Sequence, residues 1–175
     1  MKQSLFTMEH ARQLTADTYE LVLSGDTSAI TAPGQFVNIQ LPGKFLRRPI
    51  SICNWTKDAL LLLVRVVGEG THDLVRCVPG TELDVLSGLG NGFDLAKGGA
   101  HPILLGGGIG IAPQYGLAQR MLEAGIAPTV GLGFRSGGDA FYLEEFGKLG
   151  CRLMVATEDG SLGTKGFVTD LARHV

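Results

Sequence analysis

The sequence predicts a chain of the α/β plus all-β class, with an antiparallel β-barrel in residues 1–95 followed by a parallel α/β domain in residues 96–175. Up to Leu86, short segments of alternating polarity are separated by turn signals, which is typical of antiparallel strands. From His101 onward, apolar strands alternate with segments of helical spacing, and this order implies a parallel sheet. Between them, Ser87 to Ala100 holds five glycines in fourteen residues and is the predicted joint.

Periodicity and turn residues define the elements of each part. In the first part they are alternating strands from Thr18 to Leu23 and from Gln35 to Leu41, an apolar strand from Ala59 to Val67, turns at Gly25-Asp26 and Pro42-Gly43, and a helix from Thr71 to Cys77 before Pro79-Gly80. In the second part they are strands from Pro102 to Leu105, Thr129 to Phe134 and Arg152 to Ala156, and helices from Pro113 to Glu123 and Tyr142 to Leu149.

Composition limits the classes of partner. The 175 residues carry a formal net charge of -2 with no polybasic stretch, so neither nucleic acid nor an anionic membrane surface is expected to bind. The start of the chain lacks the features of a signal peptide, and no apolar run is long enough to span a membrane. Cys53, Cys77 and Cys151 lie far apart, which favours a reducing compartment and predicts a cytoplasmic protein.

Two motifs in the first part carry chemistry. Arg48-Pro49-Ile50-Ser51 enters a strand that places Ile50 on one face and Ser51 on the other. A guanidinium offers a planar fork of donors to a diphosphate, and the Ser51 hydroxyl could reach a flavin ring nitrogen; an ordinary surface strand would have the same pattern. Gly68-Glu69-Gly70-Thr71 lies between a strand and a helix, where backbone N–H groups and a capping Thr71 suit a phosphate or simply make a turn.

Two further motifs lie at the carboxyl ends of predicted parallel strands. In Gly108-Ile109-Gly110-Ile111-Ala112-Pro113, Gly108 permits a tight turn and Gly110 lets a pyrophosphate approach the backbone. Pro113 stands where the usual dinucleotide fingerprint has a third glycine, and proline is compatible with the first turn of a helix. Thr157 to Gly160, with Glu158 and Asp159, follows the third strand and is either a ligand loop or a polar cap.

The remaining polar residues suggest no catalytic or metal site. The four histidines have no metal-ligand spacing, and no Ser/His/Asp or Cys/His set is indicated by position, so no catalytic residue is predicted. Arg135 follows the second predicted strand and could contact a cofactor ribose or 2′-phosphate, or only solvent. Nothing in the sequence separates NADH from NADPH.

The order of these motifs resembles the ferredoxin-NADP reductase superfamily, in which a six-stranded FAD-binding barrel precedes a Rossmann-like nucleotide-binding domain. Within that superfamily the chain looks most like the electron-transfer subunits of NAD-dependent (class 1B) dihydroorotate dehydrogenases. The likeness covers nearly the whole chain and rests on Arg47 to Ile52, Val67 to Thr71, Gly88 to Phe93, Gly106 to Pro113 and Thr157 to Gly166.

The resemblance implies an electron relay in pyrimidine biosynthesis. Dihydroorotate would reduce FMN on a separate catalytic subunit, in a heterotetramer, and electrons would pass through a [2Fe-2S] cluster to FAD and then to NAD+. By the resemblance, FAD is held by Arg48, Pro49, Ile50 and Ser51, lined by Arg65, Val66 and Val67, and contacted by Gly70 and Thr71. The nicotinamide cofactor is served by Gly108, Ile109, Gly110, Ile111, Ala112 and Pro113 and by Glu158 and Asp159.

The sequence departs from this family in two respects. The family binds its cluster through four cysteines in a C-terminal segment, and the three cysteines here have the wrong spacing, so the chain is either a fragment or a member without the cluster. The second domain is expected to stop after three strands, which leaves Ile103 to Leu105 at an open edge that a missing segment or a partner chain would cover.

Two other functions stay open at the level of sequence. The chain could be the flavin subunit of a sulfide dehydrogenase or of a ferredoxin-NAD(P) oxidoreductase, which would keep both cofactors and change the partner. It could also be a truncated chain that binds a partner or nucleotide without turnover. Flavin binding and its response to NADH separate the last possibility from the others.

Overall fold

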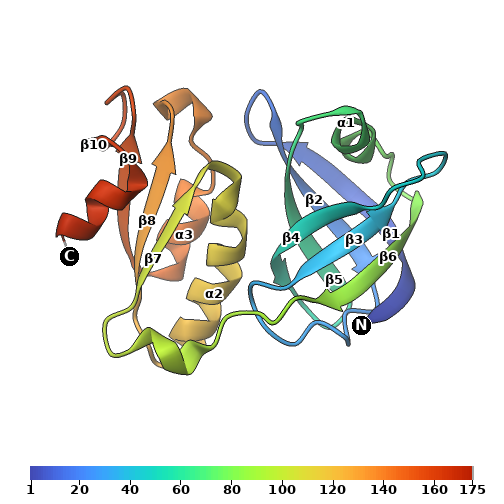
Figure 1. Cartoon of the computed structure of the whole chain (residues 1–175), viewed down its shortest axis with the longest axis horizontal. Coiled ribbons are helices and arrows are strands. Elements are labelled where there is room, and N and C mark those ends of the chain that lie inside the picture. The colour runs from blue at the N-terminus through green and yellow to red at the C-terminus, as the bar shows by residue number, and fades with distance from the viewer. Residues whose placement is uncertain (175) are drawn as a thin grey trace. The chain divides into compact units, whose positions relative to one another are not determined.

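A computed structural model of the chain describes residues 1–174, and the chain divides into two compact units, Met1–Phe93 and Asp94–Val175. The first unit is built of antiparallel strands and one short helix. The second is a parallel α/β unit (Figure 1). None of the helices among residues 1–174 combines the length and apolar character that crossing a membrane requires. The predicted fold class is confirmed in both parts.

The first unit is a closed barrel of six strands in the order β1-β2-β5-β4-β3-β6. The strands are β1 (Lys2–Gln13), β2 (Thr18–Gly25), β3 (Phe36–Gln40), β4 (Arg48–Trp55), β5 (Ala59–Arg65) and β6 (Glu82–Leu89). Alternate residues point inward and are buried, including Leu21, Leu23, Val37, Ile39 and Ile52. The core contains none of the polar side chains of the motifs. Arg48 and Ser51, for example, lie outside it, on the outer side of the barrel.

Helix α1 (Glu69–Val75) lies between β5 and β6 and packs Leu74 and Val75 onto the barrel core. It begins two residues before the predicted start at Thr71, because the Gly68 carbonyl already accepts the N–H of His72 at 2.9 Å. Gly68 is therefore the N-terminal cap. The prediction that Thr71 caps this helix is wrong in position, since Thr71 lies within its first turn.

The second unit holds a parallel sheet in the order β10-β9-β8-β7. Its strands are β7 (Ile103–Gly107), β8 (Thr129–Phe134), β9 (Arg152–Thr157) and β10 (Thr164–Lys165), with helices α2 (Ala112–Glu123) and α3 (Leu143–Leu149) and the 3-10 segments η1 (Leu95–Gly98), η2 (Gly108–Ile111), η3 (Gly137–Asp139) and η4 (Val168–His174). The expectation of three strands is wrong, because the two exposed residues of β10 add a fourth beside β9. As predicted, β7 lies at the edge of the sheet, with Ile103 40% exposed.

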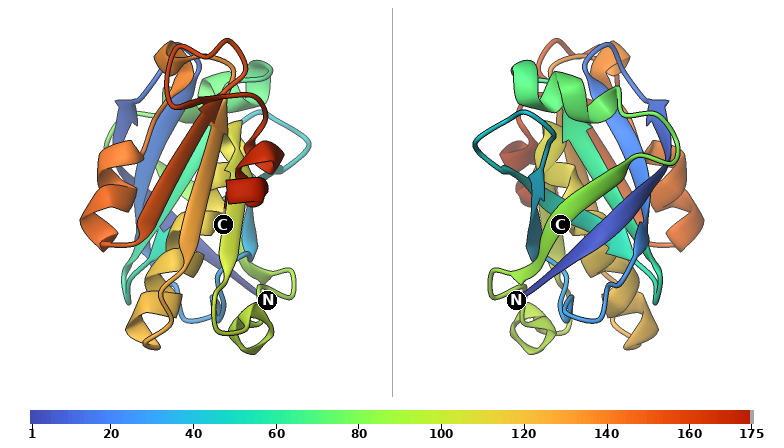
Figure 2. Two further views of the ribbon diagram at one scale, coloured as in Figure 1. Left: turned by 90° about the vertical axis from the view of Figure 1, so that its left-hand side faces the viewer. Right: turned by 90° about the vertical axis from the view of Figure 1, so that its right-hand side faces the viewer.

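The sheet of the second unit is covered on both faces. Helices α2 and α3 lie on one face, and η4 lies on the other (Figure 2). Close approach of η4 depends on two glycines of β8: a Cβ on Gly133 would come to 2.6 Å from Val168 Cβ, and a Cβ on Gly131 to 3.1 Å from Leu171 Cδ1. The C-terminal segment is thus packed into the unit rather than appended to it.

Candidate functional site

The outer surface of the barrel carries the first predicted motif at the start of β4. Ile50 and Ile52 point into the core, whereas Pro49 and Ser51 are exposed, in agreement with the predicted alternation. Strand pairing fixes this orientation, since Val37 of β3 faces Ile50 and Phe36 faces Ser51. The Ser51 hydroxyl is therefore displayed on the outside of the barrel by two flanking buried residues.

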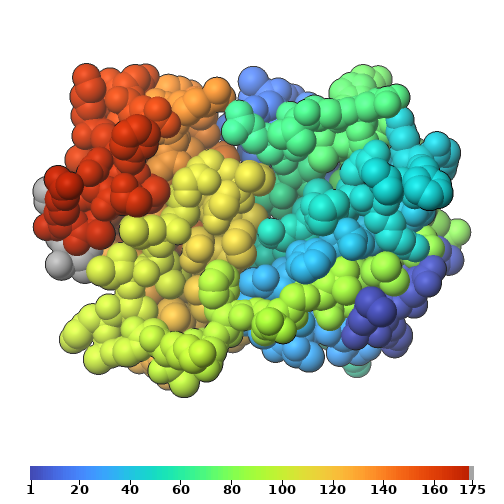
Figure 3. All heavy atoms as spheres, in the orientation of Figure 1, coloured from blue at the N-terminus to red at the C-terminus, as the bar shows by residue number. Residues whose placement is uncertain are grey.

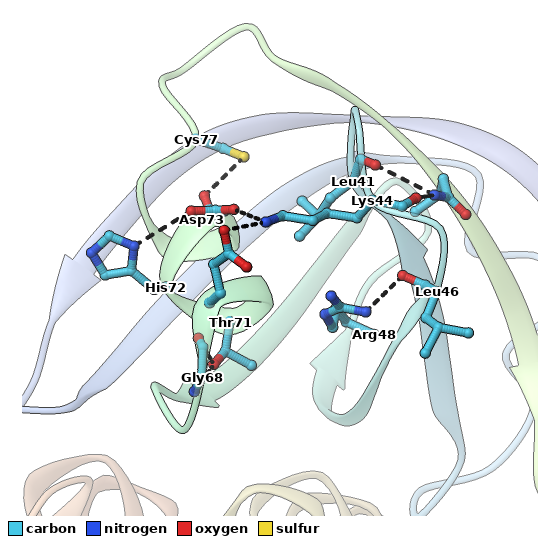
Figure 4. Close-up of polar contacts among 11 residues, drawn as sticks. Leu41, Lys44, Leu46, Arg48, Gly68, Thr71, His72, Asp73 and Cys77 are labelled. Carbon is cyan, nitrogen blue, oxygen red and sulfur yellow. Dashed lines mark hydrogen bonds and ion pairs between the residues drawn. The ribbon is translucent and has the colours of Figure 1, made fainter.

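The side chain of Arg48 turns toward α1 (Figure 4). Its Nη1 donates a hydrogen bond of 2.7 Å to the carbonyl of Leu46, and its guanidinium lies against Gly70: a Cβ there would overlap Nε and Cζ and come to 2.5 Å from Nη2. Among residues 1–174, no carboxylate forms an ion pair with Arg48. Two residues that the sequence assigned to the same cofactor, one on β4 and one on α1, are thus in contact.

Thr71 organises the first turn of α1. Its Oγ1 accepts the N–H groups of Val67 at 3.0 Å and Gly68 at 3.3 Å, and donates to the Gly68 carbonyl at 3.0 Å. The side chain of Val67 is left 81% exposed. Thr71 therefore shapes the loop between β5 and α1, and this loop presents an apolar side chain to the outside.

Sequence reasoning missed Lys44, which joins the loop before β4 to α1. Lys44 Nζ lies 2.8 Å from Glu69 Oε1 and 3.1 Å from Asp73 Oδ2, one on each side of Gly70 in the helix. These pairs raise the pKa of Lys44, and the hydrogen bond from Lys44 lowers the pKa of Asp73. In Figure 3 the segments around residues 41–50 (cyan) and 69–75 (green) accordingly lie next to each other. The sequence did show two carboxylates, Glu69 and Asp73, four residues apart on one helix face. It could not show that their partner is Lys44, which is distant in sequence.

The other residues predicted to line FAD lie at the end of β5. Arg65 Nε donates to Asp17 Oδ2 at 2.7 Å, and the N–H of Val66 donates to the Asp17 carbonyl at 2.7 Å. Val66 is partly buried against the barrel core. Asp17, in the loop between β1 and β2, therefore fixes the end of β5 through both its side chain and its backbone. The guanidinium of Arg65 differs from that of Arg48 in having an acidic partner.

In the second unit, the glycine motif makes the turn between β7 and α2. Gly108 adopts a φ of +50°, and the four residues from Gly108 to Ile111 form the 3-10 turn η2 before α2 begins at Ala112. Gly110 is exposed, and a Cβ on it would meet nothing within 4 Å, so its backbone is open to a ligand. Ile109 and Pro113 are half-buried, whereas Ile111 and Ala112 are buried and fix the turn to the unit.

The glycine that this turn itself requires is Gly106, which the sequence analysis placed at the start of the motif without assigning it a role. A Cβ on Gly106 would lie 3.0 Å from Ile111 Cα and 3.1 Å from the Gly110 carbonyl oxygen. The close approach of strand and turn therefore depends on Gly106. The run of three glycines from Gly106 to Gly108 was the signal in the sequence. Only the structure shows which of the three glycines the close approach requires.

Loops after β8 and β9 lie together at the same edge of the sheet. The N–H of Glu158 donates to the Phe134 carbonyl at 3.1 Å, and Ser161 Oγ accepts the N–H of Gly137 at 2.7 Å. Hydrogen bonds from Ser161 lower the pKa of Asp159. Arg135 and Glu158 are exposed at this edge, so the two loops bring together the predicted polar residues at the carboxyl ends of the strands.

The buried hydroxyl of Thr157 holds the loop after β9 through two hydrogen bonds to its backbone. Thr157 Oγ1 donates to the Leu162 carbonyl at 2.7 Å and accepts the Leu162 N–H at 3.1 Å. Gly163 follows with a φ of +65°, and a Cβ there would overlap the Val155 carbonyl oxygen and lie 2.8 Å from its carbon. The loop is therefore fixed by backbone packing.

The three cysteines do not provide an iron-sulfur site. Cys53 is buried, and Cys77 and Cys151 are half-buried free thiols whose pKa values are raised, chiefly by burial. Within residues 1–174, no three His, Cys, Asp or Glu side chains are grouped so as to hold a metal ion. The donor set present does not fit a [2Fe-2S] cluster, which takes four thiolates.

Curated relatives match almost the entire chain. The electron transfer subunit of dihydroorotate dehydrogenase B (NAD(+)) from Listeria monocytogenes serovar 1/2a is 40% identical over 181 residues, which are 99% of this chain and 70% of the relative. The protein of the same name from Shouchella clausii is 43% identical over 178 residues, covering 97% of this chain and 68% of the relative. The chain belongs to this family of electron transfer subunits. The resemblance stated from the motifs is thereby confirmed.

Solved structures agree with the fold. A structure described as an NADH-dependent reduced ferredoxin-NADP oxidoreductase, studied for flavin-based electron bifurcation, has a TM-score of 0.87 and 31% identity, and the match covers 98% of this chain and 63% of that chain. Phthalate dioxygenase reductase, described as passing electrons from pyridine nucleotides to [2Fe-2S], has a TM-score of 0.77 at 20% identity, with coverage of 90% and 52%, and supports the fold alone. No protein-family model matches the chain.

Proposed function

We propose that this chain binds FAD on its barrel unit and a nicotinamide dinucleotide on its α/β unit, and passes electrons between a dihydroorotate dehydrogenase catalytic subunit and NAD+. The observation that carries the proposal is the Arg48 guanidinium, which has no acidic partner among the described residues and lies against Gly70 on the outside of a complete barrel. The family relationship supplies the reaction. The chain spans about 70% of the length of the Listeria relative and 63% of the ferredoxin-NADP oxidoreductase chain, so activity and partner belong to the proposal.

The outer face of the barrel fits FAD in charge and shape. Arg48 provides a cationic planar donor for the diphosphate, and Ser51 provides a hydroxyl on the same strand face as Pro49. Exposed Val67 and half-buried Val66 offer apolar surface suited to a flat ring system. In this proposal Ile50 acts from inside the core by fixing the two exposed residues beside it.

The second unit fits a dinucleotide through its backbone. The open peptide groups around Gly108 and Gly110 precede α2, whose N-terminus favours a pyrophosphate. Arg135 and Glu158 lie at the carboxyl edge of the sheet, and Asp159 keeps its negative charge through the hydrogen bonds from Ser161. Glu158 and Asp159 are proposed to contact hydroxyl groups, for which carboxylates are suitable acceptors.

Residues of this chain position cofactors and do not exchange protons with a substrate. When bound, FAD supplies a group that exchanges a hydride with a nicotinamide and single electrons with other centres. Arg48 and the α2 N-terminus stabilise phosphate charge, and the apolar residues exclude water from the flavin surface. The cysteines present do not fit the [2Fe-2S] cluster of the family, and no step of this proposal uses one.

The proposed partner is an FMN-containing dihydroorotate dehydrogenase catalytic subunit, in a heterotetramer in the cytoplasm. The relatives are named electron transfer subunits, which supports a partner of this kind. The likeness at 31% identity to an oxidoreductase that acts on ferredoxin supports a second candidate, a flavin subunit of a ferredoxin-NAD(P) oxidoreductase.

Reconstitution tests this choice. The FAD-loaded chain is mixed with a dihydroorotate dehydrogenase catalytic subunit and NAD+, and NADH formation is followed after dihydroorotate addition. The proposal expects NADH only when both chains are present. Reduction of NAD(P)+ by reduced ferredoxin, without any dihydroorotate-dependent signal, would instead support the second candidate.

A further inference from the structure

Gly70 is a buried residue in the first turn of a surface helix, and the group that buries it is the side chain of Arg48. The Arg48 guanidinium occupies the space that a Cβ on Gly70 would need. The atoms in conflict are Nε, Cζ and Nη2, at the far end of a flexible side chain, and no backbone atom is among the three nearest. A side chain at position 70 would therefore displace Arg48 while leaving the barrel itself undisturbed.

The backbone at Gly70 gives no other reason for glycine. Gly70 does not have a positive φ, and it lies within α1 where alanine is the more favourable residue for a helix. By contrast, Gly34, Gly80 and Gly88 of the same unit have φ values of +88°, +88° and +69°, which disfavour other residues. The structural consequence of glycine at position 70 is the contact with Arg48.

A second set of contacts fixes the turn of α1 that contains Gly70. Lys44, from the loop that leads into β4, pairs with Glu69 and Asp73, which flank Gly70 along the helix. The carbonyl of Leu46, two residues before Arg48, accepts a hydrogen bond of 2.7 Å from Arg48 Nη1. The loop before β4 thus fixes both the helix turn and one nitrogen of the guanidinium, so the position of that nitrogen is set before any ligand arrives.

We infer that Gly70 is a positioning residue for Arg48: the missing side chain leaves room for the guanidinium beside α1, and this position directs it toward a diphosphate. The inference rests on the proposed function, in which Arg48 binds the FAD diphosphate. It assigns to the missing side chain of Gly70 an effect on FAD binding through Arg48, beside the FAD contact that the family resemblance implies for this position. Binding of an anion by a guanidinium is strongest when the donors are held in position before the anion arrives.

Substitution of Gly70 separates binding from stability. Gly70→Ala is expected to raise the FAD dissociation constant about tenfold, because the displaced guanidinium no longer meets the diphosphate from its preset position. The unfolding midpoint of the FAD-free chain is expected to stay the same or rise, since alanine favours the helix. Gly147→Ala in α3 is the matched control, because a Cβ there meets nothing within 4 Å. A lower midpoint in Gly70→Ala would show a structural role and overturn the inference.

A double-mutant cycle tests whether Gly70 acts through Arg48. In the Arg48→Ala background, Gly70→Ala is expected to change the FAD dissociation constant by less than about twofold. The same tenfold effect in both backgrounds would overturn the inference, because Gly70 would then act on the flavin independently of Arg48.

A readout without FAD separates this inference from the proposed function. The NMR signal of the Arg48 Nε–H group is expected to shift in the FAD-free Gly70→Ala variant and to stay in place in Gly147→Ala. If that shift occurs but the unmodified chain binds no FAD, the Arg48–Gly70 contact is supported and the proposed function fails. An unchanged signal in Gly70→Ala overturns the inference, whatever the flavin does.

Discussion

The two units build their candidate sites in different ways. In the barrel unit, Arg48 and Ser51 project from the outside of a closed core, and the core residues do not depend on them. In the α/β unit, the candidate loops are held by close backbone packing, such as that of Gly163 against Val155 and Gly106 against Ile111. Binding and stability are therefore expected to be separable in the barrel unit and coupled in the α/β unit. Substitutions in each unit test that difference.

The largest effect on stability is expected for Gly163→Ala. A Cβ at this position conflicts with the Val155 carbonyl group, and the φ of +65° is unfavourable for alanine, so the free energy of unfolding of the α/β unit should fall by about 3 kcal/mol. Denaturant unfolding measures this change. Gly147→Ala, with open space around its Cβ, is the control and should be neutral or slightly stabilising. Equal stability of the two variants would contradict the proposed packing of the loop.

Arg48→Ala should give the converse result. The FAD dissociation constant is expected to rise about 30-fold, which corresponds to about 2 kcal/mol for lost charge-assisted hydrogen bonds. The unfolding free energy of the FAD-free chain should change by less than about 0.5 kcal/mol, because Arg48 contributes no ion pair to the described fold. Flavin fluorescence titration and denaturant unfolding provide the two measurements. A large loss of stability would remove the distinction between the units.

The neighbouring Arg47 is a matched control for Arg48, because its substitution should affect stability and leave FAD binding nearly unchanged. Its guanidinium is half-buried and binds Asp84 with both nitrogens, Nη1–Oδ1 at 3.2 Å and Nη2–Oδ2 at 3.0 Å, and Nη1 also donates to the Asp84 carbonyl. Arg47→Ala should lower the unfolding free energy by about 1.5 kcal/mol. FAD affinity measured well below the unfolding transition should change less than about threefold. If Arg47→Ala weakened FAD binding as much as Arg48→Ala, the assignment of the diphosphate to Arg48 would be wrong.

The smallest effect is the pH dependence of the barrel. Hydrogen bonds from Arg47 lower the pKa of Asp84 below the ordinary value of 3.8. A carboxyl group whose pKa is lowered by folding stabilises the fold above its unfolded-state pKa, and that contribution is lost as the pH falls through the folded-state value. Stability should therefore decline below about pH 4 in the unmodified chain, and Asp84→Asn should reduce the decline. Parallel pH profiles for the two proteins would contradict a role for this pair.

Strong periodicity made the main elements predictable. Strand β8 has the predicted bounds, Thr129–Phe134, because an apolar run ends at a charged residue. The two-residue strand β10 has no apolar pattern, and its pairing with β9 depends on the loop that returns to Ala156. This strand forms only because the folded chain brings it beside β9, and the local sequence gave no signal for it.

The candidate sites were predictable as motifs and not as contacts. Residue type and order indicated Arg48 and Gly70, but two adjacent arginines have the same local pattern, and only the position of Asp84 on β6 shows which is structural. Likewise, Lys44 joins α1 across 25 or more positions of sequence. Such long-range pairs leave no periodic signal.

Binding of FAD and its reduction by NADH can be tested together by the absorbance spectrum of the purified chain loaded with FAD, recorded before and after addition of NADH without oxygen. We expect a bound flavin spectrum that bleaches on NADH addition, with weaker flavin retention in Arg48→Ala. A chain that retains no FAD, or a bound flavin that NADH leaves unchanged, would contradict it.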